Sequence, residues 1–362
     1  MTVKVEGDFR PVIEKVISQL LHLRGTINED EVPIGIVSMN NWEWPQGVAL
    51  FSLYLYFKET NDPAILDYLL QWYDRKIGEN DLPPININTM CPMLALSYIW
   101  EERPEDKYLK LCKYWADYAL HHLPRTEEGG LQHLVSGNFD NPGELWDDTL
   151  YMTVLFLARM GEILDRNDLR QESIRQFLVH VKYLTDVRTG LFFHGWTFEG
   201  NNHFAQALWG RGNAWYTAGI VDYLEMVTLP EGVKLFLLGT LQRQLETLEK
   251  LQAESGMWHT LLDDPGSYEE TSATAAFAYG ILKSVRQGFI DPKYADMGWK
   301  AFRAVLSKID EKGVVHGVSY GTGLGRSLDD YRNIPICPMP YGQSMTLLML
   351  VEGMKHHGGE SQ

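Results

Sequence analysis

Two adjacent carboxylates, Asp147 and Asp148, stand near the start of an otherwise almost wholly apolar segment, LWDDTLYMTVLFLARMGEIL. Burying an ionised carboxylate without partners is costly, so an aspartate here either caps a helix or serves as an acid with a shifted pKa. One of the pair can cap a helix that starts near Thr149. The other is then free to act as a general acid or base in a cavity beside Trp146. A purely structural Asp-Asp pair remains the alternative.

A second group with chemical potential lies in HFAQALWGRGNAW, where Trp209, Arg211 and Trp215 surround the start of another apolar segment. A guanidinium between two aromatic faces suits a ring-shaped anion such as a uronate, which arginine can hold with two parallel hydrogen bonds. Gly210 and Gly212 favour the close approach of another group to the backbone. The alternative is an arginine that satisfies carbonyls at a helix end, among core tryptophans.

Four histidines follow short glycine-started runs: His133 in GGLQH, His194 in GLFFH, His259 in GMWH and His316 in GVVH. They are separated by 61, 65 and 57 residues, an interval that fits one helical hairpin. We expect such equivalent positions to bring the histidines to one rim of a repeating fold. The alternative is that each histidine only caps or packs its own loop.

Polar and aromatic groups precede other apolar segments as well. NNWEWPQG places Trp42 and Trp44 before one of them, and PPININTMCP places Asn86 and Asn88 before the next. Asn88 is a fair helix cap, as is Glu270 in SYEETSATAAF. Because a helix N-terminus carries a partial positive charge, several such ends facing one cavity suit an anionic sugar.

The elements that must position these residues fall into two alternating kinds. Six segments are apolar on nearly every side, which requires that they be covered all round: 48–57, 90–100, 149–160, 212–224, 273–285 and 344–354. Six others are amphipathic: 9–24, 62–77, 106–122, 167–184, 232–251 and 292–308. The alternation predicts an all-α fold, an (α/α)6 barrel of six inner and six outer helices with short β-strands on one rim. We expect a single catalytic domain over residues 1–362.

Composition excludes several classes of function. The formal net charge of -16 opposes binding to nucleic acid. No apolar run long enough to cross a membrane and no secretory leader are evident, so a cytoplasmic location is the default expectation. The odd number of widely spaced cysteines, Cys91, Cys112 and Cys337, indicates reduced core thiols. Sequence motifs for metal ligation or for phosphate-binding loops are missing, and we expect neither metal nor cofactor. We interpret GTGLGR, 321–326, as a loop over the rim.

The segments LWDDTLYMTVLFLAR, GLFFHGW, HFAQALWGRGNAW and YEETSATAAFAYGI together resemble the unsaturated rhamnogalacturonyl hydrolases of glycoside hydrolase family 105, to which the family 88 unsaturated glucuronyl hydrolases are related. The resemblance runs from about residue 10 to residue 355. It implies that Asp148 is the general acid and base and that His194 belongs to the site. A second aspartate of many relatives appears here as asparagine, at Asn88 or Asn86.

The resemblance also implies a reaction: hydration of the C4=C5 double bond in the terminal uronic acid that a polysaccharide lyase leaves behind. Asp148 would protonate C4 and then, as a carboxylate, take a proton from the water that adds at C5. The hemiketal opens and releases the neighbouring sugar. This requires a raised pKa for Asp148, which apolar neighbours such as Trp146 and Met152 would supply. His194 would orient the water or Asp148, and Arg211 would bind the uronate or neighbouring polar groups.

The predicted site thus comprises Asp148 and His194 as catalytic residues and eight substrate-binding residues: Asn88, Trp42, Trp44, His133, Trp146, Trp209, Arg211 and Trp215. The expected partner is an unsaturated uronyl oligosaccharide, most simply of rhamnogalacturonan (pectin) type. The neighbouring sugar stays open among rhamnose, another neutral sugar and an amino sugar, as does the oligomeric state. Alternative functions are an inverting glycosidase or sugar epimerase on the same barrel, or a non-catalytic carbohydrate-binding protein.

Overall fold

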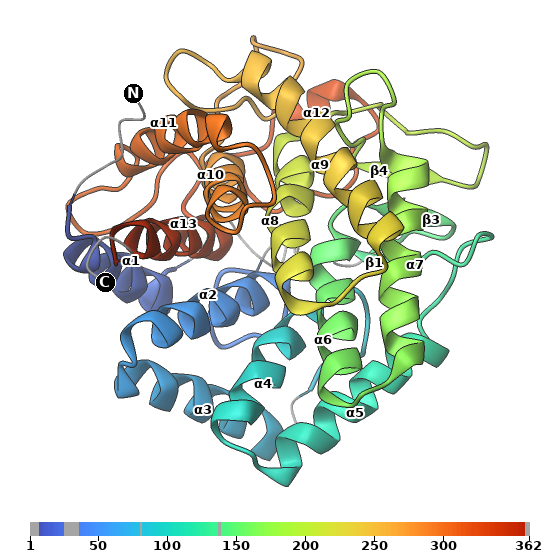
Figure 1. Ribbon diagram of the computed structural model, residues 1–362, viewed down its shortest axis with the longest axis vertical. Coiled ribbons are helices and arrows are strands. Elements are labelled where there is room, and N and C mark those ends of the chain that lie inside the picture. Colours follow the sequence, from blue (N-terminus) through green and yellow to red (C-terminus); the bar gives the residue numbers. More distant parts are fainter. Residues whose placement is uncertain (1–6, 25–35, 80–81, 137–138, 359–362) are drawn as a thin grey trace.

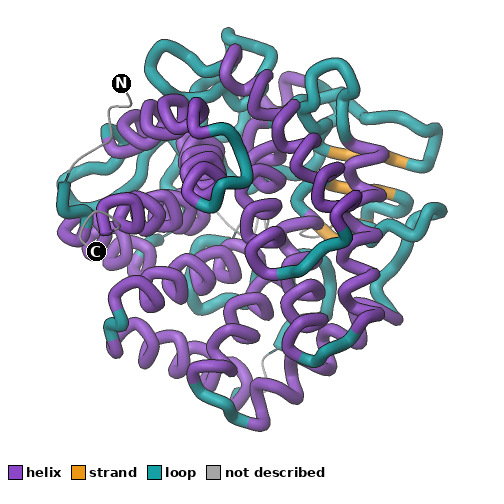
Figure 2. Tube along the Cα trace, viewed as in Figure 1, coloured by secondary structure: helices purple, strands orange, loops and turns teal. Residues whose placement is uncertain are grey.

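A computed structural model describes residues 7–24, 36–79, 82–136 and 139–358, and helices make up most of it (Figure 2). The inner helices are α2 (Trp44–Thr60), α4 (Cys91–Glu102), α6 (Leu155–Ile163), α8 (Gly210–Met226), α10 (Thr271–Arg286) and α13 (Pro340–Gly358). The outer helices are α1 (Arg10–His22), α3 (Pro63–Gly78), α5 (Asp106–His121), α7 (Asn167–Leu184), α9 (Glu231–Leu251) and α11 (Ala295–Leu306). A short helix, α12 (Leu328–Arg332), precedes the last inner helix.

The inner helices form a closed ring. Each contacts the next, in the order α2, α4, α6, α8, α10, α13 and back to α2 (Figure 1). Every outer helix packs on the inner helix that follows or precedes it in the chain, except that α1, the first, packs on α13, the last. The predicted (α/α)6 barrel is therefore confirmed, and the two ends of the described chain close it.

Burial explains why the inner segments are apolar on all sides. All residues of α10 from Thr271 to Ser284 are buried, because α8, α11 and α13 surround the helix. Outer helices bury one face only; in α1 this face consists of Ile13, Val16, Ile17 and Leu20. Inner helices also approach one another closely. A Cβ added to Gly280 of α10 would lie 2.4 Å from the Thr217 carbonyl oxygen of α8.

Two predicted helices differ in their details. The segment 149–160 begins with a π-helical turn, Leu150–Val154, before α6 starts at Leu155; such wide turns are rare and often occur at functional sites. The segment 292–308 is divided into a 3-10 turn, Pro292–Tyr294, and α11, since Asp291 caps the turn by accepting the backbone N–H of Lys293. The prediction for 167–184 matches α7 at both ends.

Short strands occur among the rim loops, as predicted. β1 (Val135–Ser136) pairs antiparallel with β2 (Phe139–Asp140), and β3 (Glu144–Trp146) pairs antiparallel with β4 (Gly195–Thr197). The β3–β4 register sets Trp146 opposite Gly195. The predicted glycine repeat is real, since Gly129, Gly190, Gly256 and Gly313 all have positive φ angles between 74° and 95°. Each allows the sharp turn after an outer helix that a side chain would strain.

Candidate active site

The N-terminal ends of the inner helices surround a hollow at the rim that carries the strands. The structure brings eight of the predicted site residues to its wall, together with three others; the lining consists of Trp44, Asn88, His133, Ser136, Trp146, Asp148, Met152, Trp209, Arg211, Trp215 and Thr322. Tryptophan faces and polar groups therefore share one small space. This mixture is typical of a sugar-binding site, because a sugar ring has both apolar faces and polar edges.

Many polar atoms around the hollow are buried without a hydrogen-bond partner in the described part of the chain. They are Asn88 Oδ1, both ring nitrogens of His133, Asp148 Oδ1, His194 Nε2, Trp209 Nε1 and Arg211 Nε. Leaving one such group unpaired costs about 1–3 kcal/mol. A concentration of unpaired groups that a stable protein would otherwise avoid indicates a place prepared for a polar ligand.

Asp148 is the carboxyl group that reaches this hollow. Its side chain is 16% exposed, and its Oδ1 lies 3.6 Å from His133 Nε2. His133 stacks on the Trp146 ring, with 4.1 Å between centroids and 11° between planes. Trp146 is fixed in turn, since its Nε1 donates to Glu144 at 2.8 Å. A short strand, β3, thus holds the wall against which His133 and Asp148 meet.

Asp147 has a different environment. It is 1% exposed, and neither carboxyl oxygen has a hydrogen-bond partner among the described residues. Its carboxyl group packs against the first turn of α8, where a Cβ on Gly212 would lie 1.9 Å from Asp147 Oδ2. Burial, followed by the negative charge of Asp148, raises the pKa of Asp147 well above its usual value. Its surroundings therefore favour the protonated form of Asp147.

The structure corrects the expectation that one aspartate caps the helix. Thr149 occupies the cap position, and no side chain accepts a hydrogen bond there. It also corrects the expectation of a raised pKa for Asp148. Burial favours the neutral form, but His133, and after it His194 and His180, hold the pKa of Asp148 below its usual value. The apolar neighbours do not outweigh these histidines.

His194 lies directly behind the hollow. Its carbonyl oxygen accepts the Asp147 N–H at 3.0 Å, because β3 and β4 run side by side. Its ring packs on Trp209, with centroids 4.3 Å apart, and its Nδ1 lies 2.7 Å from the hydroxyl oxygen of Tyr331. Burial lowers the pKa of His194 to about 3, so the ring is neutral at neutral pH.

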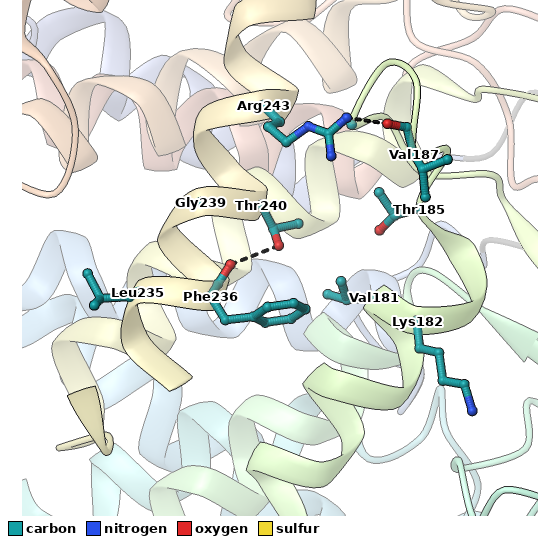
Figure 3. A pocket seen from close by; sticks show the side chains of 10 residues that line it. Val181, Lys182, Thr185, Val187, Leu235, Phe236, Gly239, Thr240 and Arg243 are labelled. Atoms are coloured by element: carbon teal, nitrogen blue, oxygen red, sulfur yellow. Dashed lines mark hydrogen bonds between the residues drawn. The ribbon is translucent and has the colours of Figure 1, made fainter. Parts of the chain in front are cut away.

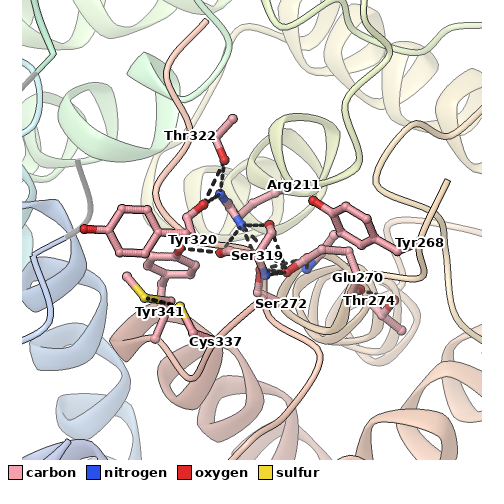
Figure 4. Close-up of polar contacts among 12 residues, drawn as sticks. Arg211, Tyr268, Glu270, Ser272, Thr274, Ser319, Tyr320, Thr322, Cys337 and Tyr341 are labelled. Carbon is pink, nitrogen blue, oxygen red and sulfur yellow. Dashed lines mark hydrogen bonds and ion pairs between the residues drawn. The ribbon is translucent and has the colours of Figure 1, made fainter. Parts of the chain in front are cut away.

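Arg211 is buried, and its two terminal nitrogens are fully engaged (Figure 4). Nη1 donates to the carbonyl and hydroxyl oxygens of Ser319, at 3.1 and 2.7 Å. Nη2 donates to the Tyr320 carbonyl oxygen at 3.1 Å and to Thr322 Oγ1 at 2.8 Å. Of the two roles predicted for Arg211, the structure therefore shows contact with neighbouring polar groups. Only Nε of its guanidinium has no hydrogen-bond partner within the described residues, and a role in binding the uronate stays a prediction.

The aromatic neighbours of Arg211 also differ from the expectation. The guanidinium lies between Trp209 and Tyr341, each 4.7 Å from its centre, whereas Trp215 packs edge-on against Trp44. Glu270 lies 3.7 Å away and caps α10 as predicted, since it accepts the Ala273 N–H at 2.6 Å. Arg211 thus fastens the loop that begins at Ser319 onto the barrel.

The residues predicted at the starts of the first two inner helices, α2 and α4, differ in whether they line the hollow. Trp44 lines the hollow, but Trp42 turns into the wall, where it packs on Trp72 and Trp115 and donates through Nε1 to the Thr89 carbonyl oxygen at 2.8 Å. Asn88 lines the hollow and caps no helix, since α4 begins after Met90 without a side-chain cap. The neighbouring turn is held instead by Asn86 Oδ1, which accepts backbone N–H groups of the next residues.

Only two of the four repeated histidines reach the site. The ring of His259 is hydrogen-bonded at the rim to the Ser267 carbonyl oxygen, at 2.5 Å, and His316 pairs with Asp310 at 2.9 Å and is exposed. The histidines follow equivalent outer helices, as expected, but His259 and His316 have partners of their own and do not contribute to the hollow. The repeat sets equivalent positions around a ring, and positions on opposite sides of a ring stay apart.

Sequence reasoning missed several groups at or near the hollow. Ser136 and Thr322 line it from loops. Glu43, between Trp42 and Trp44, caps α2 by accepting the Trp44 N–H at 2.9 Å, and burial raises its pKa to about 7. The quoted motif NNWEWPQG contains this carboxylate, so its place before an inner helix could have revealed it.

A larger hollow, of about 460 Å³, lies between the outer helices α7 and α9 (Figure 3). Val181 and Phe236 contribute apolar surface to it, and Lys182 and Arg243 lie at its edges. It contains neither a carboxylate nor a histidine, so it lacks the groups needed for acid and base chemistry.

No helix in the described ranges is long and apolar enough to cross a membrane.

Comparison with known proteins agrees with this geometry. The model of Glycosyl Hydrolase Family 88 matches residues 17–357. The chain is 34% identical over 316 residues to the unsaturated rhamnogalacturonyl hydrolase YesR of Bacillus subtilis, covering 87% of this chain and 90% of that protein.

Two crystal structures described as possible members of glycoside hydrolase family 105 are also similar, each at 41% identity. The one from Klebsiella pneumoniae superposes with a TM-score of 0.93, covering 99% of this chain and 95% of that one. The one from Salmonella enterica serovar Paratyphi A gives 0.92, covering 96% and 94%.

Proposed function

Since the chain belongs to Glycosyl Hydrolase Family 88, we propose that this glycosidase removes the terminal 4,5-unsaturated uronic acid from oligosaccharides made by a polysaccharide lyase. The observation that carries the proposal is the set of unpaired buried polar atoms around Asp148, in a hollow walled by tryptophans. The name of the Bacillus subtilis relative favours a rhamnogalacturonan-type substrate, and hence pectin as its source. The cytoplasmic location expected from the sequence stays a prediction.

Asp148 serves as both acid and base in this proposal. Its protonated carboxyl group gives a proton to C4 of the double bond, while water adds at C5 and loses a proton to the carboxylate that results. The C5 hemiketal then opens, and the bond to the neighbouring sugar breaks. Asp148 is suited to this role because it reaches the hollow, whereas Asp147 is enclosed.

The low pKa of Asp148 in the empty site is compatible with this chemistry. An anionic uronate next to Asp148 disfavours a second negative charge and so raises its pKa. Substrate binding also displaces water, which strengthens the effect. His133 Nε2 lies 3.6 Å from Asp148, and its other ring nitrogen, Nδ1, has no hydrogen-bond partner among the described residues and can donate to the uronate.

The test is the loss of ultraviolet absorbance from the conjugated double bond of unsaturated disaccharides when enzyme is added. We expect Asp148→Asn to reduce the rate by at least about a hundredfold, since general acid–base catalysis contributes about 10²–10⁴-fold. Asp296→Asn, an exposed aspartate on α11, is the matched control and keeps the wild-type rate. Full activity in Asp148→Asn would overturn the assignment of the acid.

Two further outcomes separate the alternatives. Saturated substrates consumed at a comparable rate would indicate an inverting glycosidase or an epimerase. Oligosaccharide binding without turnover of any unsaturated substrate would indicate a binding protein.

A further inference from the structure

Tyr331 was not among the expected site residues, yet it is buried directly behind the hollow. It lies on α12, which Ser327 and Asp330 fix with reciprocal hydrogen bonds at its N-terminus. Its ring belongs to a small apolar cluster with Trp209 and Leu261. The position of its hydroxyl group is therefore well defined by packing on one side and by the capped helix on the other.

The Tyr331 hydroxyl group joins the rim loop to His194. Its oxygen accepts the backbone N–H of Gly325 at 3.1 Å and lies 2.7 Å from His194 Nδ1. Gly325 N–H can only donate, so the single phenol hydrogen remains available for the histidine. Burial raises the pKa of Tyr331 far above neutrality, which keeps that hydrogen in place. No other acceptor within the described residues lies at hydrogen-bond distance from this hydroxyl group, so we assign its hydrogen to the bond with Nδ1.

This hydrogen bond decides where His194 carries its own hydrogen. A neutral imidazole has one donor and one acceptor nitrogen. With Nδ1 as acceptor, the hydrogen is on Nε2. His194 Nε2 is buried and has no hydrogen-bond partner within the described residues. In this tautomer His194 has one unpaired N–H donor, next to Trp146 and Trp209 of the hollow wall, and no free acceptor nitrogen, which leaves proton removal to Asp148.

The loop that supplies Gly325 also contributes to the wall of the hollow. Thr322 lines the hollow, and Leu324 packs on the backbone beside His194: a Cβ on Gly195 would lie 2.1 Å from Leu324 Cδ1. In this arrangement, the volume of the hollow in which the centre of a water molecule fits is about 20 Å³. This is enough for only about one or two waters. A sugar ring needs more room, so the wall of the hollow, to which Thr322 belongs, has to shift as substrate enters.

We propose that Tyr331 is a positioning residue, which links the segment 320–326 to His194 and holds that histidine as an Nε2–H donor for the reacting sugar or water. The inference rests on the proposed function only for the nature of the ligand. The hydrogen position of His194 is a property of the free protein. An experiment can therefore contradict the assigned hydrogen position of His194 without contradicting the proposed function, and the reverse.

The first test is nitrogen NMR of histidine-labelled enzyme, with His194 assigned by its loss in His194→Gln. We expect a bare Nδ1 and a protonated Nε2 in the wild type. In Tyr331→Phe we expect a mixture of both tautomers, since the donor to Nδ1 is gone. Tyr216→Phe is the matched control, because it removes another buried hydroxyl group, one that donates to the Leu237 carbonyl oxygen, and leaves the His194 signal unchanged. A wild-type His194 with its hydrogen on Nδ1 would overturn the proposal, whether or not the variant folds.

Kinetics provide the second test. Losing one orienting hydrogen bond is expected to lower kcat of Tyr331→Phe about tenfold with little change in KM. An unchanged kcat would contradict the role of Tyr331.

Gly325→Ala tests the link to the segment, because its Cβ would lie 2.6 Å from Tyr331 Cε2 and must push the two residues apart. We expect the His194 signal to move toward that of Tyr331→Phe. An unaltered signal would show that the segment does not act through Tyr331.

Discussion

Asp147 and Asp148 are neighbours in the chain, yet their surroundings shift their pKa values in opposite directions. Asp147 packs against the backbone of α8 without a partner and has a raised pKa, whereas Asp148 faces His133 and has a lowered one. His194 and His180 are neutral at neutral pH, since burial lowers their pKa values to about 3 and about 4. Among the histidines, His133 lowers the pKa of Asp148 the most.

Replacing His133 should shift the pH profile in a defined direction. The acid must be protonated, so kcat falls as pH rises through the pKa of Asp148. Without His133 that pKa rises, and we expect the alkaline limb of kcat in His133→Gln to move to higher pH. The measurement is kcat against pH with an unsaturated disaccharide. The exposed His316→Gln should leave the limb in place. An unmoved limb in His133→Gln would show that another group holds the pKa.

Glu43 gives a prediction for stability. Its pKa rises from 4.5 to about 7 because of burial, so between these values the folded protein keeps a proton that the unfolded chain has released. The Glu43 contribution to stability is therefore present below about pH 4.5 and is lost as pH rises toward 7. Glu43→Gln keeps an oxygen for the Trp44 N–H and should become more stable relative to the wild type from pH 5 to pH 8.

Urea unfolding at the two pH values checks this prediction for Glu43. The exposed Glu254→Gln should show the same difference from the wild type at both. A difference for Glu43→Gln that does not change with pH would mean that Glu43 is charged when folded.

At the scale of elements, the site depends on how β3 and α8 approach each other. Gly212, in the first turn of α8, leaves room for the Asp147 carboxyl group, and the β3–β4 pairing ties the same residue to His194. As a result, the next residue, Asp148, lies in the wall of the hollow. The wide turn at Leu150–Val154 follows directly.

Gly212→Ala should therefore damage both stability and activity. The new Cβ would lie 1.9 Å from Asp147 Oδ2, and relieving that overlap moves Asp147 and its neighbour Asp148. We expect a loss of about 1–3 kcal/mol in the free energy of unfolding, as for other overpacked sites, with at least a tenfold loss of kcat. Urea titration and disaccharide assays measure the two. Gly239→Ala on α9, with open space around its Cα, should keep activity and at least wild-type stability.

The elements themselves could be predicted from the sequence to a large extent, because a helix buried on all sides and a helix buried on one side have different patterns. The contacts between distant segments could not. Trp42 and Trp44 are two positions apart, and only the packing of α3 and α5 decides that Trp42 enters the wall. Arg211 donates to Ser319 and Thr322, which lie more than a hundred residues further along the chain, and no local sequence pattern indicates these two partners.

At the scale of the whole molecule, the two ends of the inner helices carry different polar side chains. At the N-terminal ends, unpaired polar atoms surround the hollow. Toward the C-terminal ends, buried charges are paired: Lys283 of α10 lies 2.6 Å from Asp222 of α8, and Arg286 pairs with Glu352 of α13 at 2.6 Å. These ion pairs join neighbouring helices at the end of the barrel away from the hollow.

Closure of the ring depends on the contact between the first outer helix and the last inner one. Gln343 of α13 is fully buried, and its side chain donates to the carbonyl oxygens of Val16 in α1, at 3.1 Å, and of Gly313, at 2.8 Å. It also accepts the N–H of Val315 at 2.6 Å. One side chain thus joins both ends of the described chain to the turn after α11.

Gln343→Met keeps the volume of this side chain and removes all three hydrogen bonds. Since each buried group left unpaired costs about 1–3 kcal/mol, and some find water, we expect unfolding to become easier by about 2–4 kcal/mol. Activity per folded molecule should persist, because Gln343 lies outside the hollow. Urea unfolding compares it with Gln171→Met, an exposed glutamine of α7 that should stay within about 0.5 kcal/mol of the wild type. Equal stability of the two variants would mean that packing alone closes the ring.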